Sequence, residues 1–121
     1  MERQIRLRKN EDFVRVYRRG IASYTRDFTL IAKRNGAKGN RYGFSISKKM
    51  GKANKRNLLK RRLREIVRLN EARFPVGYDF VIIPKEAARE LDYRELMRSL
   101  VYSAARLENV LHKKKDAARS K

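Results

Sequence analysis

Residues 47–69 are SKKMGKANKRNLLKRRLREIVRL, and this stretch carries the strongest pattern in the chain. Nine basic residues and no acidic one lie within 48–64. At about 100° per residue, one helical face is apolar. Its members are Leu59, Leu63, Ile66 and Val67. The stretch therefore predicts an amphipathic helix over 54–74, with Asn54 as its cap and Pro75 just after its end.

The opposite face of this predicted helix is cationic. Its members are Asn57, Lys60, Arg61, Arg64 and Arg68. One interpretation is an ordinary solvated face, but such faces mix acidic and basic residues at i, i+4 because like charges at that spacing are unfavourable. Here Lys60 with Arg64, and Arg64 with Arg68, are like-charged pairs at that spacing. We therefore expect a polyanion to contact this face, with Arg suited to bidentate phosphate contacts.

The composition supports a single basic domain over 1–121. The chain has 33 Lys+Arg against 13 Asp+Glu, a formal net charge of +20, and this excess favours nucleic acid as the partner. Its apolar fraction of 41% is enough for one modest core, and it has no Cys for disulfides or thiolate metal sites. Neither a secretory signal nor a membrane-spanning run is evident, so a soluble cytoplasmic protein is expected. A flexible basic arm is expected over 1–9 and a flexible basic tail over 113–121.

The hydrophobic periodicity along the chain predicts the element order α-β-β-α-β-α. A short helix is expected from a cap at Asn10 to Gly20, and strands over 24–33 and 41–47 are expected to pair as a hairpin through the glycine-containing loop 34–40. A buried strand over 78–83 follows the basic helix. Asp92 and Glu95 form a capping box that opens a final amphipathic helix to about residue 112. This order predicts an α+β fold with a single-layer sheet and packed helices.

Six rings lie on the first predicted helix and the first two predicted strands. They are Phe13, Tyr17, Tyr24, Phe28, Tyr42 and Phe44. Two interpretations are open, because strand aromatics usually pack in the core, whereas single-stranded nucleic acid is often held by base stacking beside a basic groove. We expect Phe28 and Phe44 to be core residues. For Phe13 and Tyr17, on a short helix next to a basic arm, both interpretations stay open.

Residues for catalysis are sparse. The single histidine, His112, lies at the end of the last helix, and the carboxylates suit helix starts, caps and surfaces rather than a metal site. Gly51-Lys52 lacks the earlier glycine and the following Ser or Thr of a phosphate-binding loop. We therefore expect no catalytic residue and no metal site in the chain itself.

The stretch from Ser47 to Glu65, with its pattern SKK-x-G-x-A followed by RN and KR-x-x-RE, closely resembles the signature of the protein subunit of bacterial ribonuclease P. The resemblance extends to the first helix, to Phe28, to the strand over 77–83 and to the final helix, so it covers nearly the whole chain. It implies an RNA-binding subunit of an endoribonuclease that matures the 5′ end of tRNA. Its partners would be ribonuclease P RNA and the 5′ leader of precursor tRNA, with Mg²⁺ held mainly by the catalytic RNA.

The resemblance also implies site residues and details of the fold. The helix contacts to the catalytic RNA would be Arg56, Asn57, Lys60, Arg61 and Arg64. The cationic face of the predicted helix adds Arg68. A basic connector would comprise Lys48, Lys49 and Lys52. A leader cleft between the first helix and the sheet would comprise Phe13, Tyr17, Ile31 and Ser45. The fold would resemble domain 2 of ribosomal protein S5, with a left-handed βαβ crossover.

Two positions depart from the family pattern. The family has an Arg-Asn-Arg triplet where this chain has Arg56-Asn57-Leu58, so Leu58 replaces a basic residue. Ile31 stands where the family often has an aromatic residue that lines the cleft. Two other classes are alternatives: a ribosomal or ribosome-assembly RNA-binding protein, and a DNA-binding module that uses 54–74 as a recognition helix. A DNA-binding module of this kind would have a short helix-turn-helix before Asn54. The sequence does not show one, and we expect no DNA partner.

Overall fold

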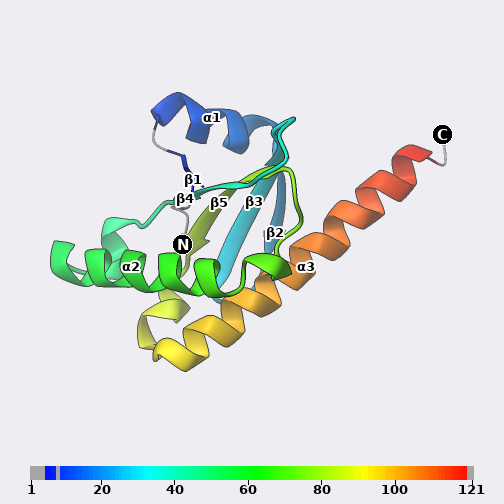
Figure 1. Ribbon diagram of the computed structural model, residues 1–121. Helices are drawn as coiled ribbons and strands as arrows, with labels where there is room; N and C mark the ends of the chain where they lie inside the picture. Colours follow the sequence, from blue (N-terminus) through cyan, green and yellow to red (C-terminus); the bar gives the residue numbers. More distant parts are fainter. Residues whose placement is uncertain (1–4, 8, 120–121) are drawn as a thin grey trace.

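The sheet of this protein has an α-helix on one face and two on the other (Figure 1). The structure is a computed structural model that describes residues 5–7 and 9–119, with side chains described as far as Lys114. Its strands are β1 (Ile5–Arg6), β2 (Ile21–Tyr24), β3 (Phe28–Arg34), β4 (Arg41–Phe44) and β5 (Tyr78–Pro84). Its α-helices are α1 (Asn10–Arg19), α2 (Ala53–Leu69) and α3 (Tyr93–Arg119). The predicted α+β class is confirmed.

The order of strands in the sheet is β1-β4-β5-β3-β2. The predicted hairpin between β3 and β4 is therefore wrong, because β5 lies between them and runs antiparallel to β3 and parallel to β4. The apolar run of β5 is buried on both faces, which requires a central position in the sheet. The true hairpin is β2–β3, closed by a turn in which the Thr25 N–H donates to the Phe28 carbonyl at 2.9 Å.

The connection from β4 through α2 to the neighbouring parallel strand β5 is a βαβ unit. Its predicted left-handedness and the likeness to the ribosomal protein domain stay predictions. Two short strands, β1 and β2, were not predicted as separate elements. β1 falls inside the expected flexible arm and pairs in parallel with β4.

The main core lies between the sheet and the pair α2 and α3. Leu63, Ile66 and Val67 of α2 are fully buried there, as the helical pattern predicts. The amphipathic character predicted for the final helix is also confirmed. Its apolar residues in the same core are Leu96, Leu100, Ala104, Leu107 and Leu111. A second, smaller cluster lies under α1 and comprises Leu7, Val16, Ile31 and Val81. The sheet is thus covered on both faces, but α1 covers only part of its face.

The helix ends agree with prediction where a local signal is strong. The capping box is confirmed, because the Glu95 N–H donates to the Asp92 carboxylate at 2.8 Å and the Asp92 N–H donates to the Glu95 carboxylate at 3.0 Å. The caps predicted at Asn10 and Asn54 are wrong: Asn10 is the first residue of α1, and α2 begins at Ala53 after Lys52. α2 ends at Leu69, and a 3-10 turn (Glu71–Arg73) completes the segment to Phe74.

α3 continues past His112 to Arg119, so its predicted end was too early. Flexibility of the arm and of the tail stays a prediction.

Asn40, a buried side chain just before β4, fixes the start of β5. Its amide donates to the Tyr42 hydroxyl at 3.0 Å and to the Pro75 carbonyl at 2.9 Å. Its carbonyl oxygen accepts from the backbone N–H groups of Gly77 and Tyr78 at 2.7 and 3.0 Å. One side chain thus satisfies four polar partners at the junction from which β5 enters the sheet.

Candidate nucleic-acid interface

The outward side of α2 is cationic, as predicted. Asn57, Arg61 and Arg68 are exposed, and Lys60 and Arg64 are half-buried. We call these five residues the α2 basic face. Burial, and secondly the positive charge of Arg6, lower the pKa of Arg64 below the ordinary value of a guanidinium. The α2 basic face and Arg6 of β1 thus bring positive charge together, which favours an anionic partner there.

The basic connector before α2 is anchored by one apolar side chain. Lys48 and Lys49 are exposed on a 3-10 turn (Lys48–Met50) whose last residue, Met50, is buried at 5% exposure in the main core. Gly51 follows with φ of 121°, a conformation that L side chains rarely adopt. Arg56 donates from Nε to the Gly51 carbonyl at 3.1 Å. Arg56, predicted as an RNA contact, therefore also holds the turn that orients the connector lysines.

A cleft of about 280 Å³ lies where α1, β1, β4 and α2 meet. We call it the α1–α2 cleft. Its charged members are Arg6, Lys60 and Arg64, and its apolar members are Leu7, Phe13 and the strand residues 42–44. It joins an aromatic ring on α1 to two cations of the α2 basic face. A ring beside cations in a groove is the arrangement that holds single-stranded nucleic acid.

Gly43 of β4 sets how closely α1 approaches the sheet. A Cβ atom at this position would lie 2.6 Å from Cζ of Phe13 and 3.1 Å from Cβ of Leu7. The absence of a side chain at Gly43 therefore leaves space that the chain's own Phe13 occupies. The Phe13 ring, seated against β4 in this way, forms one wall of the α1–α2 cleft.

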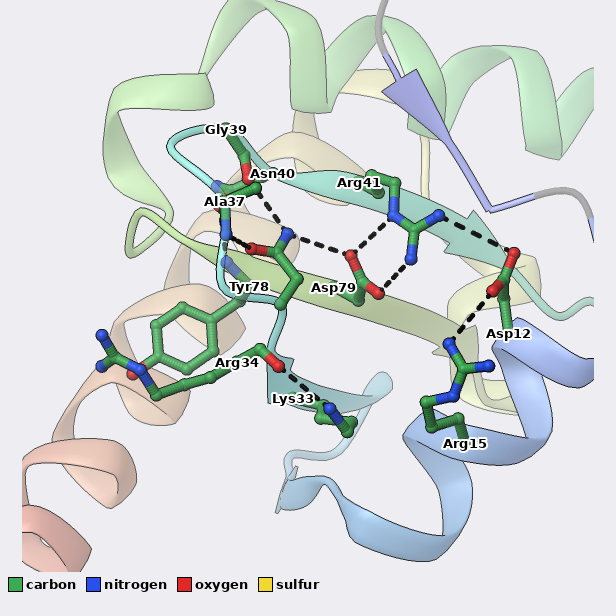
Figure 2. Close-up of polar contacts among 11 residues, drawn as sticks. Asp12, Arg15, Lys33, Arg34, Ala37, Gly39, Asn40, Arg41, Tyr78 and Asp79 are labelled. Carbon is green, nitrogen blue, oxygen red and sulfur yellow. Dashed lines mark hydrogen bonds and ion pairs between the residues drawn. The ribbon is translucent and has the colours of Figure 1, made fainter.

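A polar network connects α1 to the first residues of β4 and β5 (Figure 2). Arg41 donates from Nε and Nη2 to the two carboxylate oxygens of Asp79 at 2.9 and 2.6 Å. Its Nη1 lies 3.8 Å from an oxygen of Asp12, at the start of α1. The Asn35 amide also donates to Asp79, at 3.1 Å. α1 is thereby fixed on both flanks, by Asp12 on one and by Phe13 on the other.

The network predicts a loss of stability in acid. Burial alone would raise the pKa of Asp79, but hydrogen bonds from Arg41 and Asn35 and the charges of Arg41 and Lys33 together hold this pKa below its ordinary value. A carboxyl with a lowered folded-state pKa contributes stability above its unfolded pKa, and this contribution is lost as the pH falls below about 4. We expect Asp79→Asn to lower the free energy of unfolding by about 1–3 kcal/mol at neutral pH.

Denaturant unfolding of both proteins between neutral and acid pH is the measurement. The difference between wild type and Asp79→Asn should narrow as the pH falls below about 4. Glu90→Gln, at an exposed carboxylate, is the control and should follow the wild type at every pH. A difference between Asp79→Asn and wild type that stays constant into acid would contradict a stabilising carboxylate at Asp79.

Comparisons with known proteins agree with one another. The Ribonuclease P family model matches residues 1–108. The ribonuclease P protein component of Finegoldia magna is 45% identical over 109 residues, which cover 90% of this chain and 96% of that protein.

The chain belongs to the ribonuclease P protein family.

Solved structures of other ribonuclease P proteins have the same fold. The protein from Thermotoga maritima superposes with a TM-score of 0.79 at 32% identity, covering 85% of this chain and 97% of that one. The protein from Staphylococcus aureus gives a TM-score of 0.77 at 29% identity, covering 84% and 93%. This chain is thus a component of ribonuclease P, an endoribonuclease of tRNA processing, and a partner of ribonuclease P RNA.

The residues predicted to form the leader cleft of this ribonuclease P protein differ in their exposure. Phe13 lines the α1–α2 cleft, and Tyr17, four residues on, is exposed at 44%. Ser45 is half-buried just beyond the cleft residues of β4. Ile31 is only 8% exposed, packed beneath α1 with Val16. Ile31 therefore supports α1 from below, and a base could reach it only if α1 moved.

Burial agrees with the prediction that Phe28 and Phe44 are core residues. Phe28 and Tyr42 are core residues, and Phe44 is half-buried against the same core. Leu58, the departure from the basic triplet, is 39% exposed and lines a separate groove with Lys55 and Arg62. Leu58 therefore lies outside the α2 basic face and outside the α1–α2 cleft.

Two contributors to this interface were not predicted. Arg6 was counted only as part of a basic arm, although β1 places it against Arg64. The Arg41–Asp79 pair depends on which strands are neighbours. The parallel register of β4 and β5 pairs Arg41 with Asp79, and knowledge of that register would have revealed the ion pair.

In the part of the chain that the structure describes, no three metal-binding side chains come together. Nor is any helix among those residues long and apolar enough to span a membrane.

Proposed function

We propose that this ribonuclease P protein holds the 5′ leader of precursor tRNA against α1 while the α2 basic face lies on ribonuclease P RNA. The observation that carries the proposal is the α1–α2 cleft, because it places the Phe13 ring within one small space with Lys60 and Arg64. A single strand in that cleft meets a stacking surface on one side and phosphate-binding groups on the other. The adjoining α2 basic face extends the same positive surface outward to a larger RNA.

The chemical step is assigned to the RNA partner. The described residues bring no three metal-binding side chains together, and we propose that the metal-dependent step belongs to ribonuclease P RNA. Mg²⁺ is then held mainly by ribonuclease P RNA, and the protein acts by positive charge and by positioning. Cations that neutralise phosphates where two RNA molecules meet lower their mutual repulsion, and less Mg²⁺ is then needed to bring them together. The proposed cellular location is the cytoplasm, and DNA is not a proposed partner.

Leader recognition predicts a specific effect of Phe13→Ala. Loss of a stacking ring should weaken the binding of precursor tRNA to the assembled ribonucleoprotein by about 1–3 kcal/mol, with little change in salt dependence. Binding of mature tRNA, which lacks the leader, should not change. Phe13→Leu is the matched variant, because it keeps an apolar side chain over Gly43 but removes the ring.

The measurement is the dissociation constant of labelled precursor and mature tRNA for each ribonucleoprotein at several salt concentrations. Equal losses for precursor and mature tRNA would place the effect outside the leader and would contradict the proposal. A wild-type affinity for precursor tRNA in both Phe13 variants would contradict it as well.

A further inference from the structure

A row of side chains crosses the α1 face of the sheet beyond the edge of α1. Phe44 pairs with Ile82, and the Ser45 N–H, just after β4, donates to the Ile82 carbonyl at 3.0 Å, so Ser45 lies beside Ile83. Ile83 pairs with Thr29, and Thr29 pairs with Tyr24. Successive members therefore come from the end of β4 and from β5, β3 and β2, and all four point to the face on which α1 lies. Strands lie about 4.8 Å apart, so the row is about 14 Å long.

This row is open where the neighbouring row is closed. The neighbouring row, which lies under α1, comprises Gly43, Val81, Ile31 and Ala22. Val81 and Ile31 are buried there in the α1 cluster. In the open row, by contrast, Ser45, Thr29 and Ile83 are half-buried and Tyr24 is 67% exposed. Phe44 lines the α1–α2 cleft and is followed directly by Ser45, so the open row begins beside this cleft.

Tyr24 ends the open row with a ring and a cation side by side. The Lys85 ammonium lies 5.8 Å from the centroid of the Tyr24 ring. Lys85 is held in place because it donates to the Thr25 carbonyl at 2.6 Å. Arg26, the next cation along the β2–β3 turn, has a side chain that is 84% exposed, and its Nε lies 3.8 Å from a carboxylate oxygen of Asp27. The nearest carboxylate in this turn, Asp27, accepts a hydrogen bond from Ser99 of α3 at 2.6 Å.

We propose that Tyr24 is a second stacking platform for the 5′ leader, reached only by leaders long enough to cross the sheet from Phe13 to β2. The inference rests on the proposed leader binding and extends its path. The first nucleotides of the leader occupy the α1–α2 cleft, the strand then follows the open row, and a later base stacks on Tyr24. Lys85 and Arg26 contact the phosphates at that end.

The row favours RNA over a protein partner for three reasons. Ser45, Ile83 and Thr29 are half-buried and do not stand far out from the sheet, so a strand can lie flat on it. The far end of the row presents a ring whose face suits any base, with cations beside it. Both features continue a cleft that already combines a ring with cations. An isolated exposed tyrosine would need no explanation, but this one is the end of an aligned path.

The test is a leader-length series with precursor tRNAs that carry leaders of roughly two, five and ten nucleotides. Each is bound to ribonucleoprotein assembled from ribonuclease P RNA and the wild type, Tyr24→Ala, Tyr24→Phe or Tyr102→Ala protein. Tyr102 is a matched control, since it is 59% exposed but lies on α3, on the other face of the sheet.

Tyr24→Ala should bind the longest leader about fivefold to a hundredfold more weakly than wild type and bind the shortest leader equally well. Tyr24→Phe should restore the affinity, and Tyr102→Ala should match wild type at every length. Identical behaviour of Tyr24→Ala and Tyr102→Ala would overturn the platform at Tyr24. A Phe13→Ala variant separates the two proposals. If it lowers the affinity for precursor tRNA at every leader length, leader binding in the α1–α2 cleft is supported even if Tyr24→Ala has no effect.

Discussion

Replacing Lys60, Arg61 and Arg64 together by glutamine is expected to weaken binding to ribonuclease P RNA on the order of a hundredfold at physiological salt. The three side chains lie within little more than one turn of the α2 basic face, and Lys60 and Arg64 also line the α1–α2 cleft. Removal of one cation that binds a phosphate should reduce the slope of log K against log salt by roughly one, so the slope of the triple variant should fall by about two to three. A salt titration of the RNA dissociation constant measures both quantities.

The matched control removes the same charge from another helix. Arg94, Arg98 and Arg106 are exposed on α3, and replacing them by glutamine lowers the net charge equally. If the α2 basic face binds the RNA, the α3 variant should keep an affinity near wild type. Equal reductions of affinity in the two variants would mean that net charge, rather than the face of α2, determines binding. Thermal unfolding of both variants checks that the helices remain folded.

Asn40→Ala is expected to cost about 3 kcal/mol of the free energy of unfolding, the upper end of the range expected for Asp79→Asn. The substitution removes four hydrogen bonds and leaves the N–H groups of Gly77 and Tyr78 and the carbonyl of Pro75 without their side-chain partner. Unsatisfied buried groups cost more than the net value of the hydrogen bonds that are removed. Urea unfolding followed by circular dichroism measures the change.

Asn109 provides the control for Asn40, because it is an exposed asparagine on α3. Asn109→Ala should change stability by no more than about 0.5 kcal/mol. A destabilisation by Asn40→Ala as small as that by Asn109→Ala would contradict the role of Asn40 at the start of β5. RNA binding by folded Asn40→Ala should remain close to wild type, since Asn40 neither lines the α1–α2 cleft nor belongs to the α2 basic face.

The elements that were predicted correctly are those specified by local sequence. The apolar and cationic faces of α2, the stripe of α3 and the capping box at Asp92 all depend on residues within one helix. Gly20 likewise ends α1 as predicted. The caps at Asn10 and Asn54 failed because a side chain able to cap does not by itself decide where a helix begins.

The errors concern contacts between distant segments. Loop 34–40 has the composition of a hairpin turn, but the pairing of β5 with both β3 and β4 overrides it. The same insertion of β5 pairs Arg41 with Asp79, and it aligns the open row from Ser45 to Tyr24. Neither arrangement is visible until the strand order is known. The burial of Ile31 likewise follows from the position of α1 over the sheet.

The aromatic residues show how far composition can discriminate. Phe13 and Tyr17 could not be assigned to core or surface from sequence, and the structure places Phe13 on a cleft wall and Tyr17 in solvent. Tyr24 belonged to the same group of rings, and its exposure of 67% exceeds the 44% of Tyr17. Its ring and its position at the end of the open row together suit it to stack with a base.

Multiple-turnover cleavage of precursor tRNA by the cognate ribonuclease P RNA at low Mg²⁺, with and without this protein, tests the proposed function most directly. If the protein holds the leader and neutralises phosphates where the RNA molecules meet, its addition should restore cleavage under conditions in which the RNA alone is nearly inactive. The variant with Lys60, Arg61 and Arg64 replaced should need more Mg²⁺ than wild type to reach the same rate. An unchanged rate on adding the wild-type protein at low Mg²⁺ would contradict the proposed function.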